Sequence, residues 1–334
     1  MIHHHPLLLS SSPHVFSHVN VRRLMLNVII ALLPTTVYGV YLFRAAALRV
    51  ILTSIISCIV FEILFRLIVR SRQNFRDLSA VVTGLLLALI LPPSTPSWMV
   101  VIGALAAIVM AKEFFGGLGH NPFNPALIGR AILLMGFPAA MTSWHNPLVA
   151  AEAVTGASLI DAVSATTPLA IIQQGGSLMD AAGSLGLGSV QDLYAMLFMG
   201  SHAGCIGEGS ILLILAGGLF LIATKTIVFV TPLVMLAATA GFSLILGVDP
   251  LFSVLSGGLA FGAFFMATDY ATTPLTAKGK ALFGLGAAII IVLIRKFGGY
   301  PEGVTYGILI MNAVTPYLNK LREKKYGYRK EAKK

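Results

Sequence analysis

Long apolar stretches alternate with short polar segments along almost the whole chain. Several stretches are shorter than the roughly 20 residues that a helix needs to cross a bilayer. Gly and Pro punctuate the short ones, as in broken helices that line a cavity. The pattern predicts an all-α polytopic membrane protein with ten spans, at about 24–43, 47–69, 78–92, 98–112, 124–137, 209–224, 227–246, 251–268, 281–294 and 303–318.

The composition supports this class. The chain has 334 residues, of which 57% are hydrophobic and 11% charged, and its mean hydropathy is +0.87. Because a soluble domain is about 25% charged, a soluble protein is excluded. The net charge of +10 does not indicate a nucleic-acid partner, since most basic residues lie in loops and the tail. Two cysteines without metal-ligand spacing cannot hold an iron–sulfur cluster.

The distribution of Lys and Arg predicts the orientation in the membrane. Basic residues flank the spans on one side, whereas segment 138–208 contains neither Lys nor Arg. Basic loops remain in the cytoplasm, so both termini are expected there. The expected organisation begins with a cytoplasmic N-terminal segment (1–23) and a first five-helix repeat (24–137). An extracytoplasmic loop (138–208) leads to a second five-helix repeat (209–318) and a basic cytoplasmic tail (319–334).

An internal repeat relates the two halves. Gly103-Ala-Leu-Ala-Ala-Ile precedes Phe115-Gly-Gly, and Gly284-Leu-Gly-Ala-Ala-Ile precedes Phe297-Gly-Gly. Because each half has five expected spans, an odd number, the halves should be inverted across the membrane. The alternative is that these helices share Gly and Ala for close packing.

One motif in segment 138–208 indicates a specific chemical modification. Its sequence, Asp161-Ala-Val-Ser-Ala-Thr-Thr-Pro-Leu169, resembles the flavinylation signature of the RnfD/NqrB family, in which the last Thr carries FMN through a phosphoester bond. The resemblance implies a covalent FMN on Thr167. The surrounding motif residues are Asp161, Ser164, Thr166 and Pro168.

Two alternatives to Thr167 remain. Thr166 stands where the family has Ala, which leaves two adjacent hydroxyl groups. The nearby segment Glu152-Ala-Val-Thr155-Gly-Ala-Ser158 has a similar layout, but it has Glu in place of the upstream Asp and lacks the following Pro-Leu. Thr167 therefore ranks first.

The resemblance extends over nearly the whole chain. It is carried by Ser11-Ser-Pro-His14 before the first span, by Ser79 to Pro93, by Gly116 to Ala126 and by Met266 to Pro274. The opening and the Thr-Pro-Leu ending are most like RnfD, rather than the quinone-reducing NqrB. The family implies a urea-transporter-like fold of two inverted five-helix repeats.

A second group of polar residues lies at the expected cytoplasmic ends of spans. The resemblance implies that Asn121, Asn124, Asp269 and Thr273 belong either to a second, non-covalent flavin site, riboflavin in the family, or to an ion path. Amide and carboxylate side chains in such places can equally cap helix ends.

Charges inside spans are expected to face the protein interior. Arg130 lies within a short span, and Glu62 and Arg66 can pair because they are four residues apart. Arg66 could instead snorkel from its span end toward water. His202 is expected to be a polar loop residue.

The resemblance implies a subunit of an inner-membrane complex that passes electrons between ferredoxin and NAD and translocates Na⁺ or H⁺. The chain would relay electrons and would not be catalytic alone. Its expected partners are the Rnf A, B, C, E and G subunits, with the FMN-bearing G subunit nearest in function, the lipid bilayer, and a flavin transferase for maturation. An NqrB-like quinone-reducing subunit, a urea-transporter-class solute channel and a structural scaffold are the alternatives.

Overall fold

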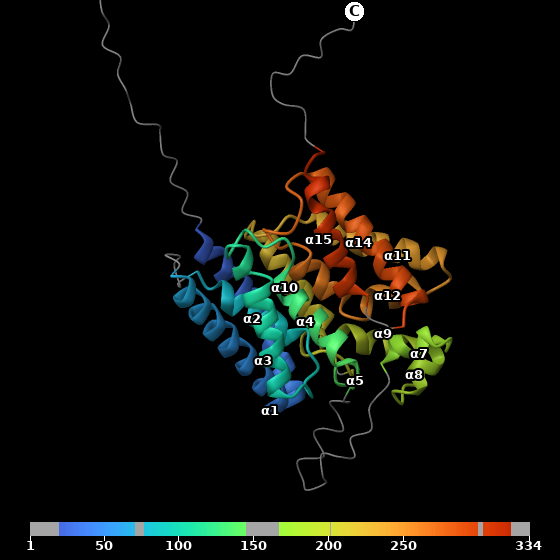
Figure 1. Ribbon diagram of the computed structural model, residues 1–334. Coiled ribbons are helices and arrows are strands. Elements are labelled where there is room, and N and C mark those ends of the chain that lie inside the picture. Colours follow the sequence, from blue (N-terminus) through green and yellow to red (C-terminus); the bar gives the residue numbers. More distant parts are fainter. Residues whose placement is uncertain (1–19, 71–76, 145–166, 201, 300–302, 322–334) are drawn as a thin grey trace, which may run out of the picture.

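The computed structural model describes residues 20–70, 77–144, 167–200, 202–299 and 303–321. Within these ranges the regular structure is helical and no strand occurs, which confirms the predicted all-α class. The earlier helices gather on one flank of the molecule and the later helices on the other, with α4 and α10 between them (Figure 1).

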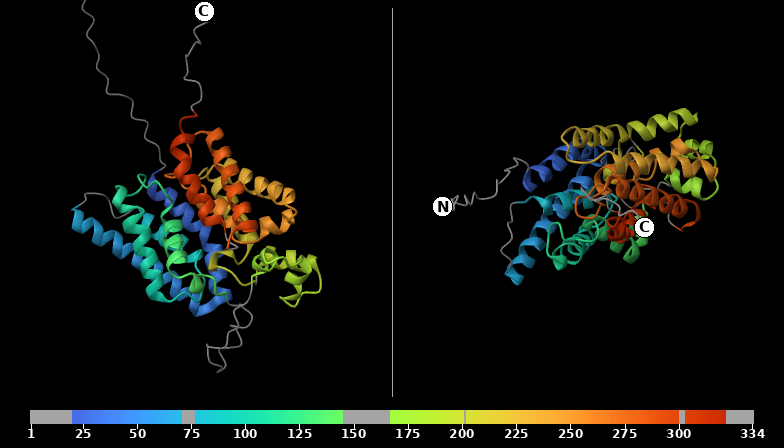
Figure 2. Two further views of the ribbon diagram at one scale, coloured as in Figure 1. Left: turned by 45° about the vertical axis from the view of Figure 1, so that its right-hand side comes forward. Right: turned by 90° about the horizontal axis from the view of Figure 1, so that it is seen from above.

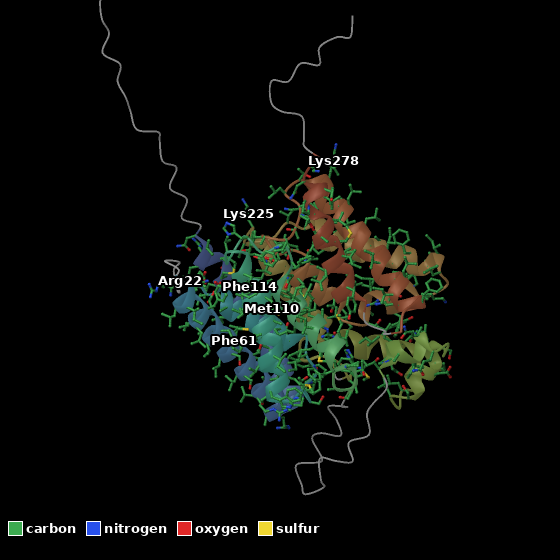
Figure 3. The ribbon with its side chains drawn as sticks, viewed as in Figure 1. Arg22, Phe61, Met110, Phe114, Lys225 and Lys278 are labelled. Carbon is green, nitrogen blue, oxygen red and sulfur yellow. The ribbon has the colours of Figure 1, made fainter. Side chains whose placement is uncertain are left out.

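Three helical stretches are long and apolar enough to cross a membrane: α1 (Val21–Val69), the run Ser97–Phe115 and α14 (Ala277–Phe297). Shorter apolar helices accompany them, namely α2 (Ser79–Leu89), α4 (Pro125–Gly136), α10 (Ile211–Ala223), α11 (Val230–Ile245) and α15 (Val304–Leu318). Apolar side chains such as Met110 and Phe114 remain exposed on the flank of the molecule (Figure 3). These features are those of a membrane protein.

The first two expected spans both lie in α1, a long helix with a sharp break inside it. Arg44 has φ 49 and ψ −130, which is not helical. The break lies between the expected spans 24–43 and 47–69, so each of these stretches forms a helix of its own. Asn20 caps the start of α1 by accepting a hydrogen bond from the Arg23 amide at 2.9 Å.

The expected span 251–268 is divided in two. Helix α12 (Pro250–Leu255) ends before Gly257 and Gly258, which have φ values of 63 and 64. Only glycine adopts this left-handed conformation at low cost, so the chain turns here. It then continues as α13 (Leu259–Phe261) and a π-helix, η5 (Gly262–Met266).

The run that precedes α4 also changes its helical type. Helix α3 (Ser97–Leu105) continues as a π-helix, η1 (Ala106–Met110), and a short 3₁₀ helix, η2 (Glu113–Phe115), follows it. π-helical segments inside longer helices often mark functional sites.

Segment 138–208 contains more helix than a plain loop would. Its described residues form α5 (Pro138–Met141), α7 (Pro168–Gln173), α8 (Leu178–Gly183), α9 (Val190–Met199) and η4 (Ile206–Glu208). Ser177 and Asp180 form a capping box at α8. A small apolar core holds α7–α9 against α12, through Leu169, Ala181, Ala182, Leu193, Leu197 and Phe252.

Two labelled lysines lie on the side of the molecule away from these extra helices. Lys225 and Lys278 lie in the upper part of the view (Figure 3), and we call this the basic side. Helices α7 and α8 lie at the lower right in both side views (Figures 1 and 2), and we call that the loop side.

Candidate functional site

Two polar sites lie at opposite ends of the helices. The first is a cavity of about 70 Å³ toward the basic side, which the side chains of Asn121, Asn124 and Asp269 help to line. These residues are far apart in the sequence, and the structure brings them together. The enclosed space is large enough for a few water molecules. A flat three-ring ligand is larger, so it would have to extend out through the mouth of the cavity.

Both asparagines also have structural roles. Asn124 caps α4, where its Oδ1 accepts from the Ala126 amide at 3.1 Å, and its Nδ2 donates to the Met266 carbonyl at 3.3 Å. Asn121 donates to the Phe123 carbonyl at 3.1 Å and is hydrogen-bonded to Asp269. The predicted capping role of Asn124 is therefore confirmed, and its amide links the start of α4 to the end of η5.

Asp269 is the acidic group of this cavity. Its Oδ2 accepts from the Thr272 hydroxyl at 3.2 Å, and its backbone carbonyl accepts from the Thr273 hydroxyl at 2.7 Å. Thr273 thus stabilises the turn and does not line the cavity. The N-terminal residues of α2 and α4 do line it, which places two positive helix-dipole ends beside the carboxylate.

A buried ion cluster adjoins this cavity. Lys112, which also lines the cavity, donates to Glu62 at 2.7 Å and to the Ser79 hydroxyl at 2.6 Å. Arg66 pairs with Glu62 and lies 3.1 Å from Glu113. The predicted Glu62–Arg66 pair is confirmed.

Arg66 does not snorkel to water, as its place near a span end suggested. Its side chain is fully buried because acidic partners inside the protein neutralise it. The roles of Lys112 and Glu113 were not predicted. To predict these roles, one would have had to infer that segments about 50 residues apart in the sequence meet in the fold.

The second site is on the loop side at Thr167. This residue is the N-cap of α7, and its Oγ1 accepts from the Ala170 amide at 3.3 Å. Pro168 follows at the first helical position, where proline is favoured. The other candidate residues of this region, Asp161, Ser164, Thr166, Thr155 and Ser158, lie outside the described residues.

Two cavities flank α7. Thr167 lines a small one of about 20 Å³ together with His202, Glu208 and Ser256. Leu169 separates it from a larger cavity of about 690 Å³, whose polar lining includes Gln173, Arg295 and Lys296. The larger volume lies within the range of roughly 300–1,000 Å³ that cofactor-sized ligands occupy. A cofactor-sized space with hydrogen-bond donors thus lies across Leu169 from the cavity that Thr167 lines.

A second set of charges adjoins the small cavity at Thr167, which Glu208 also lines. Arg130 donates from Nη1 to the Cys205 sulfur at 3.1 Å, and both Arg130 and Arg295 interact electrostatically with Glu208. Arg295 in turn donates to the Ser253 carbonyl at 2.6 Å and to the Ser256 carbonyl at 2.9 Å. The prediction that Arg130 faces the interior is confirmed.

His202 is buried, which differs from the exposed loop position expected for it. Burial lowers the pKa of its imidazole to about 4, so the ring is neutral. Burial also raises the pKa of Glu208 in η4, against the opposing effect of Arg130. The sequence did not predict this cluster of one Glu, one His and two Arg, because the spacing of these residues follows no motif.

Comparison with known proteins finds relatives that match nearly the whole chain. The profile of the NQR2, RnfD, RnfE family matches residues 8–327. The chain is 44% identical to the D subunit of a proton-translocating ferredoxin:NAD⁺ oxidoreductase complex of Clostridium ljungdahlii, over 96% of each chain. It is 42% identical to the D subunit of a Na⁺-translocating ferredoxin:NAD⁺ oxidoreductase complex of Acetobacterium woodii, over 98% of each chain. The D subunit of an ion-translocating oxidoreductase complex from Stutzerimonas stutzeri is 37% identical, over 92% of each chain.

Proposed function

The chain belongs to the NQR2, RnfD, RnfE family, and from this premise we propose that it is the D subunit of a ferredoxin:NAD⁺ oxidoreductase that translocates Na⁺ or H⁺. Relatives that match nearly its full length are subunits of such complexes, so the chain acts as part of a translocase and not as an enzyme alone. The same matches favour this function over a quinone-reducing subunit or a solute channel. Other subunits of the Rnf type are its partners.

We propose that Thr167 carries FMN as a phosphoester. The observation that supports this most directly is the position of Thr167, at the N-cap of α7 and beside a small cavity that shares Leu169 with the larger one. FMN would supply the one- and two-electron chemistry that amino acids lack. The chain would hold it at a fixed place on the loop side, where Gln173, Arg295 and Lys296 offer hydrogen-bond donors in the larger cavity.

We propose that the cavity with Asn121 and Asp269 is the second station. It lies toward the basic side and offers a carboxylate, two amides and the Lys112 ammonium group. Such a set can hydrogen-bond the edge of a non-covalent flavin such as riboflavin, or it can carry a cation. Electrons would enter at Thr167 from the FMN-bearing G subunit and continue toward the basic side.

We propose that the membrane part consists of ten spans in two inverted halves, as in urea transporters. Corresponding half-length helices begin in the same way, because Leu78 before α2 and Gly258 before α13 are both left-handed, with φ 63 and φ 64. Inverted repeats with such broken helices place sites at their interface and allow alternating access. Charge changes at a redox group could then bias one arrangement over the other.

The proposed location is the bacterial inner membrane, with both termini in the cytoplasm. The basic side then faces the cytoplasm, which the tendency of basic loops to stay in the cytoplasm supports. The loop side, with Thr167, faces outward, where a flavin transferase can reach it.

Peptide mass spectrometry on the denatured protein tests the FMN proposal. The chain is expressed together with a flavin transferase, and the gel band is first checked for flavin fluorescence. We expect an FMN adduct on the peptide containing Thr167, and its loss in Thr167→Val but not in Thr166→Val. An adduct on Thr155 or Ser158 would identify the other copy of the motif as the site. A colourless protein, made with a transferase that modifies a control substrate, would contradict the proposal.

A further inference from the structure

The carboxyl group of Glu208 occupies a niche made by two glycines. A Cβ at Gly258 would come within 2.4 Å of Glu208 Oε1, and a Cβ at Gly204 within 3.1 Å of Oε2. Neither place would admit a side chain without displacing the carboxyl group. The two glycines therefore leave room for an acid at this position, between η4 and the turn that begins α13.

Two positively charged side chains act on the carboxyl group of Glu208. They are Arg130 from α4 and Arg295 from α14. Protonation of Glu208 would remove the one negative charge among these three side chains and change their summed charge from +1 to +2. Buried charges interact strongly because the medium screens them weakly. The protonation state of Glu208 thus sets the charge of the interior near Thr167.

The other elements packed against η4 add little charge. Helix α1 presents Gly39 to Ile206, and α2 presents Leu89 to Gly207. The remaining titratable groups are the Cys205 thiol, which is hydrogen-bonded to Glu208, and the neutral imidazole of His202. Glu208 is therefore the carboxylic acid of this cluster that lines the cavity beside Thr167, and burial raises its pKa.

One small cavity is shared by Glu208 and Thr167. This space of about 20 Å³ is also lined by His202, and a second space of about 10 Å³ is lined by Glu208 and His202. Two polar atoms here, His202 Nδ1 and Ser256 Oγ, have no hydrogen-bond partner among the described residues. Each space is about large enough for a water molecule, and these atoms would bind it.

From this geometry we propose that Glu208 takes up a proton when the redox group attached to Thr167 is reduced. The proposal rests on the FMN assigned above to Thr167. One electron from the partner subunit adds one negative charge beside the cluster. One proton from water on the loop side then passes by way of the cavity water to a carboxylate oxygen of Glu208. Charge is conserved, since the carboxylate becomes a neutral carboxyl group as the electron arrives.

The physical reason is the competition between burial and the two arginines. Arg130 and Arg295 stabilise the carboxylate, whereas removal from water favours the neutral acid. A group held between two such effects responds to a further nearby charge. Glu208 is a positioning residue, because it acts on the redox group through the electric field of its charge and forms no bond to that group.

Spectroelectrochemical titration of the assembled complex tests the proposal. The signal of the flavin on Thr167 is isolated by subtracting the spectra of the Thr167→Val complex. In the wild-type protein the midpoint potential of this flavin should fall as pH rises. In Glu208→Gln, whose cluster stays at +2, the potential should shift to a more positive value and lose the part of its pH dependence that Glu208 supplies.

Matched variants and a second readout complete the test. Glu208→Asp keeps a carboxyl group and should retain the pH dependence, and Asp192→Asn, an exposed acid on the same side, should behave as wild type. Redox-difference infrared spectra of the wild-type complex should show a carboxylic C=O band on reduction, which Glu208→Gln lacks. Unchanged potentials and an unchanged infrared spectrum in Glu208→Gln would overturn the inference about Glu208 and leave the proposed function standing. Absence of flavin from wild-type Thr167 would instead overturn the proposed function.

Discussion

Arg66 is the side chain on which the buried acids of the basic side converge. Glu62 is one helical turn away on α1, and Glu113 approaches from η2. The first contact follows from the sequence, because residues four apart on a helix face each other. The second depends on how the α3–η1 run packs against α1, which no local pattern specifies.

Replacing Arg66 should therefore destabilise the fold strongly. In Arg66→Met the carboxylates of Glu62 and Glu113 would lose their shared partner inside the protein. Breaking a buried ion pair from one side costs about 3–5 kcal/mol. Thermal unfolding in detergent should show a clear fall in Tm. The control is Arg22→Met, which removes an exposed charge and should change stability by no more than about 0.5 kcal/mol. Equal Tm values for both variants would contradict this role for Arg66.

At the scale of elements, the apolar pattern located the helices but not their breaks. Each expected span has a helical counterpart among the described residues, because each apolar stretch is long enough to form one. The pattern merged α12 with α13, since Gly257 and Gly258 look like the packing glycines that are common in membrane helices. It also gave no sign of the π-helices η1 and η5, whose altered hydrogen bonding depends on tertiary packing.

Close helix packing gives a prediction at this scale. Helices α3 and α4 cross where a Cβ at Gly129 would lie 2.6 Å from the backbone oxygen of Gly103. Gly129→Ala should push the helices apart and cost about 1–3 kcal/mol, the usual effect of overpacking. Gly136→Ala on the same helix meets no atom within 4 Å and should leave Tm unchanged or slightly raised. The comparison by thermal unfolding fails if both variants lose stability equally.

At the scale of the whole molecule, the candidate sites were only partly visible in the sequence. Asn121, Asn124 and Asp269 were predicted as a group because they sit at the expected cytoplasmic ends of spans, and all three line one cavity. The cluster of Arg130, Glu208 and Arg295 was not, because it joins α4, η4 and α14 through contacts between distant segments. The sequence predicted residues that belong to a motif or to a regular helical spacing. It did not predict residues that meet only through tertiary packing.

The arrangement of the two sides predicts how the protein sits in the membrane. Met179 on α8 is exposed on the loop side, and Lys278 lies on the basic side (Figure 3). Basic segments remain cytoplasmic, so a membrane-impermeant maleimide should label Met179→Cys in cells with a permeabilised outer membrane. Lys278→Cys should react only in inside-out vesicles. The native Cys58 and Cys205 are buried, so the unmodified chain gives the background. Labelling of Lys278→Cys from outside would reverse the orientation and place Thr167 beyond the reach of a transferase outside the cytoplasm.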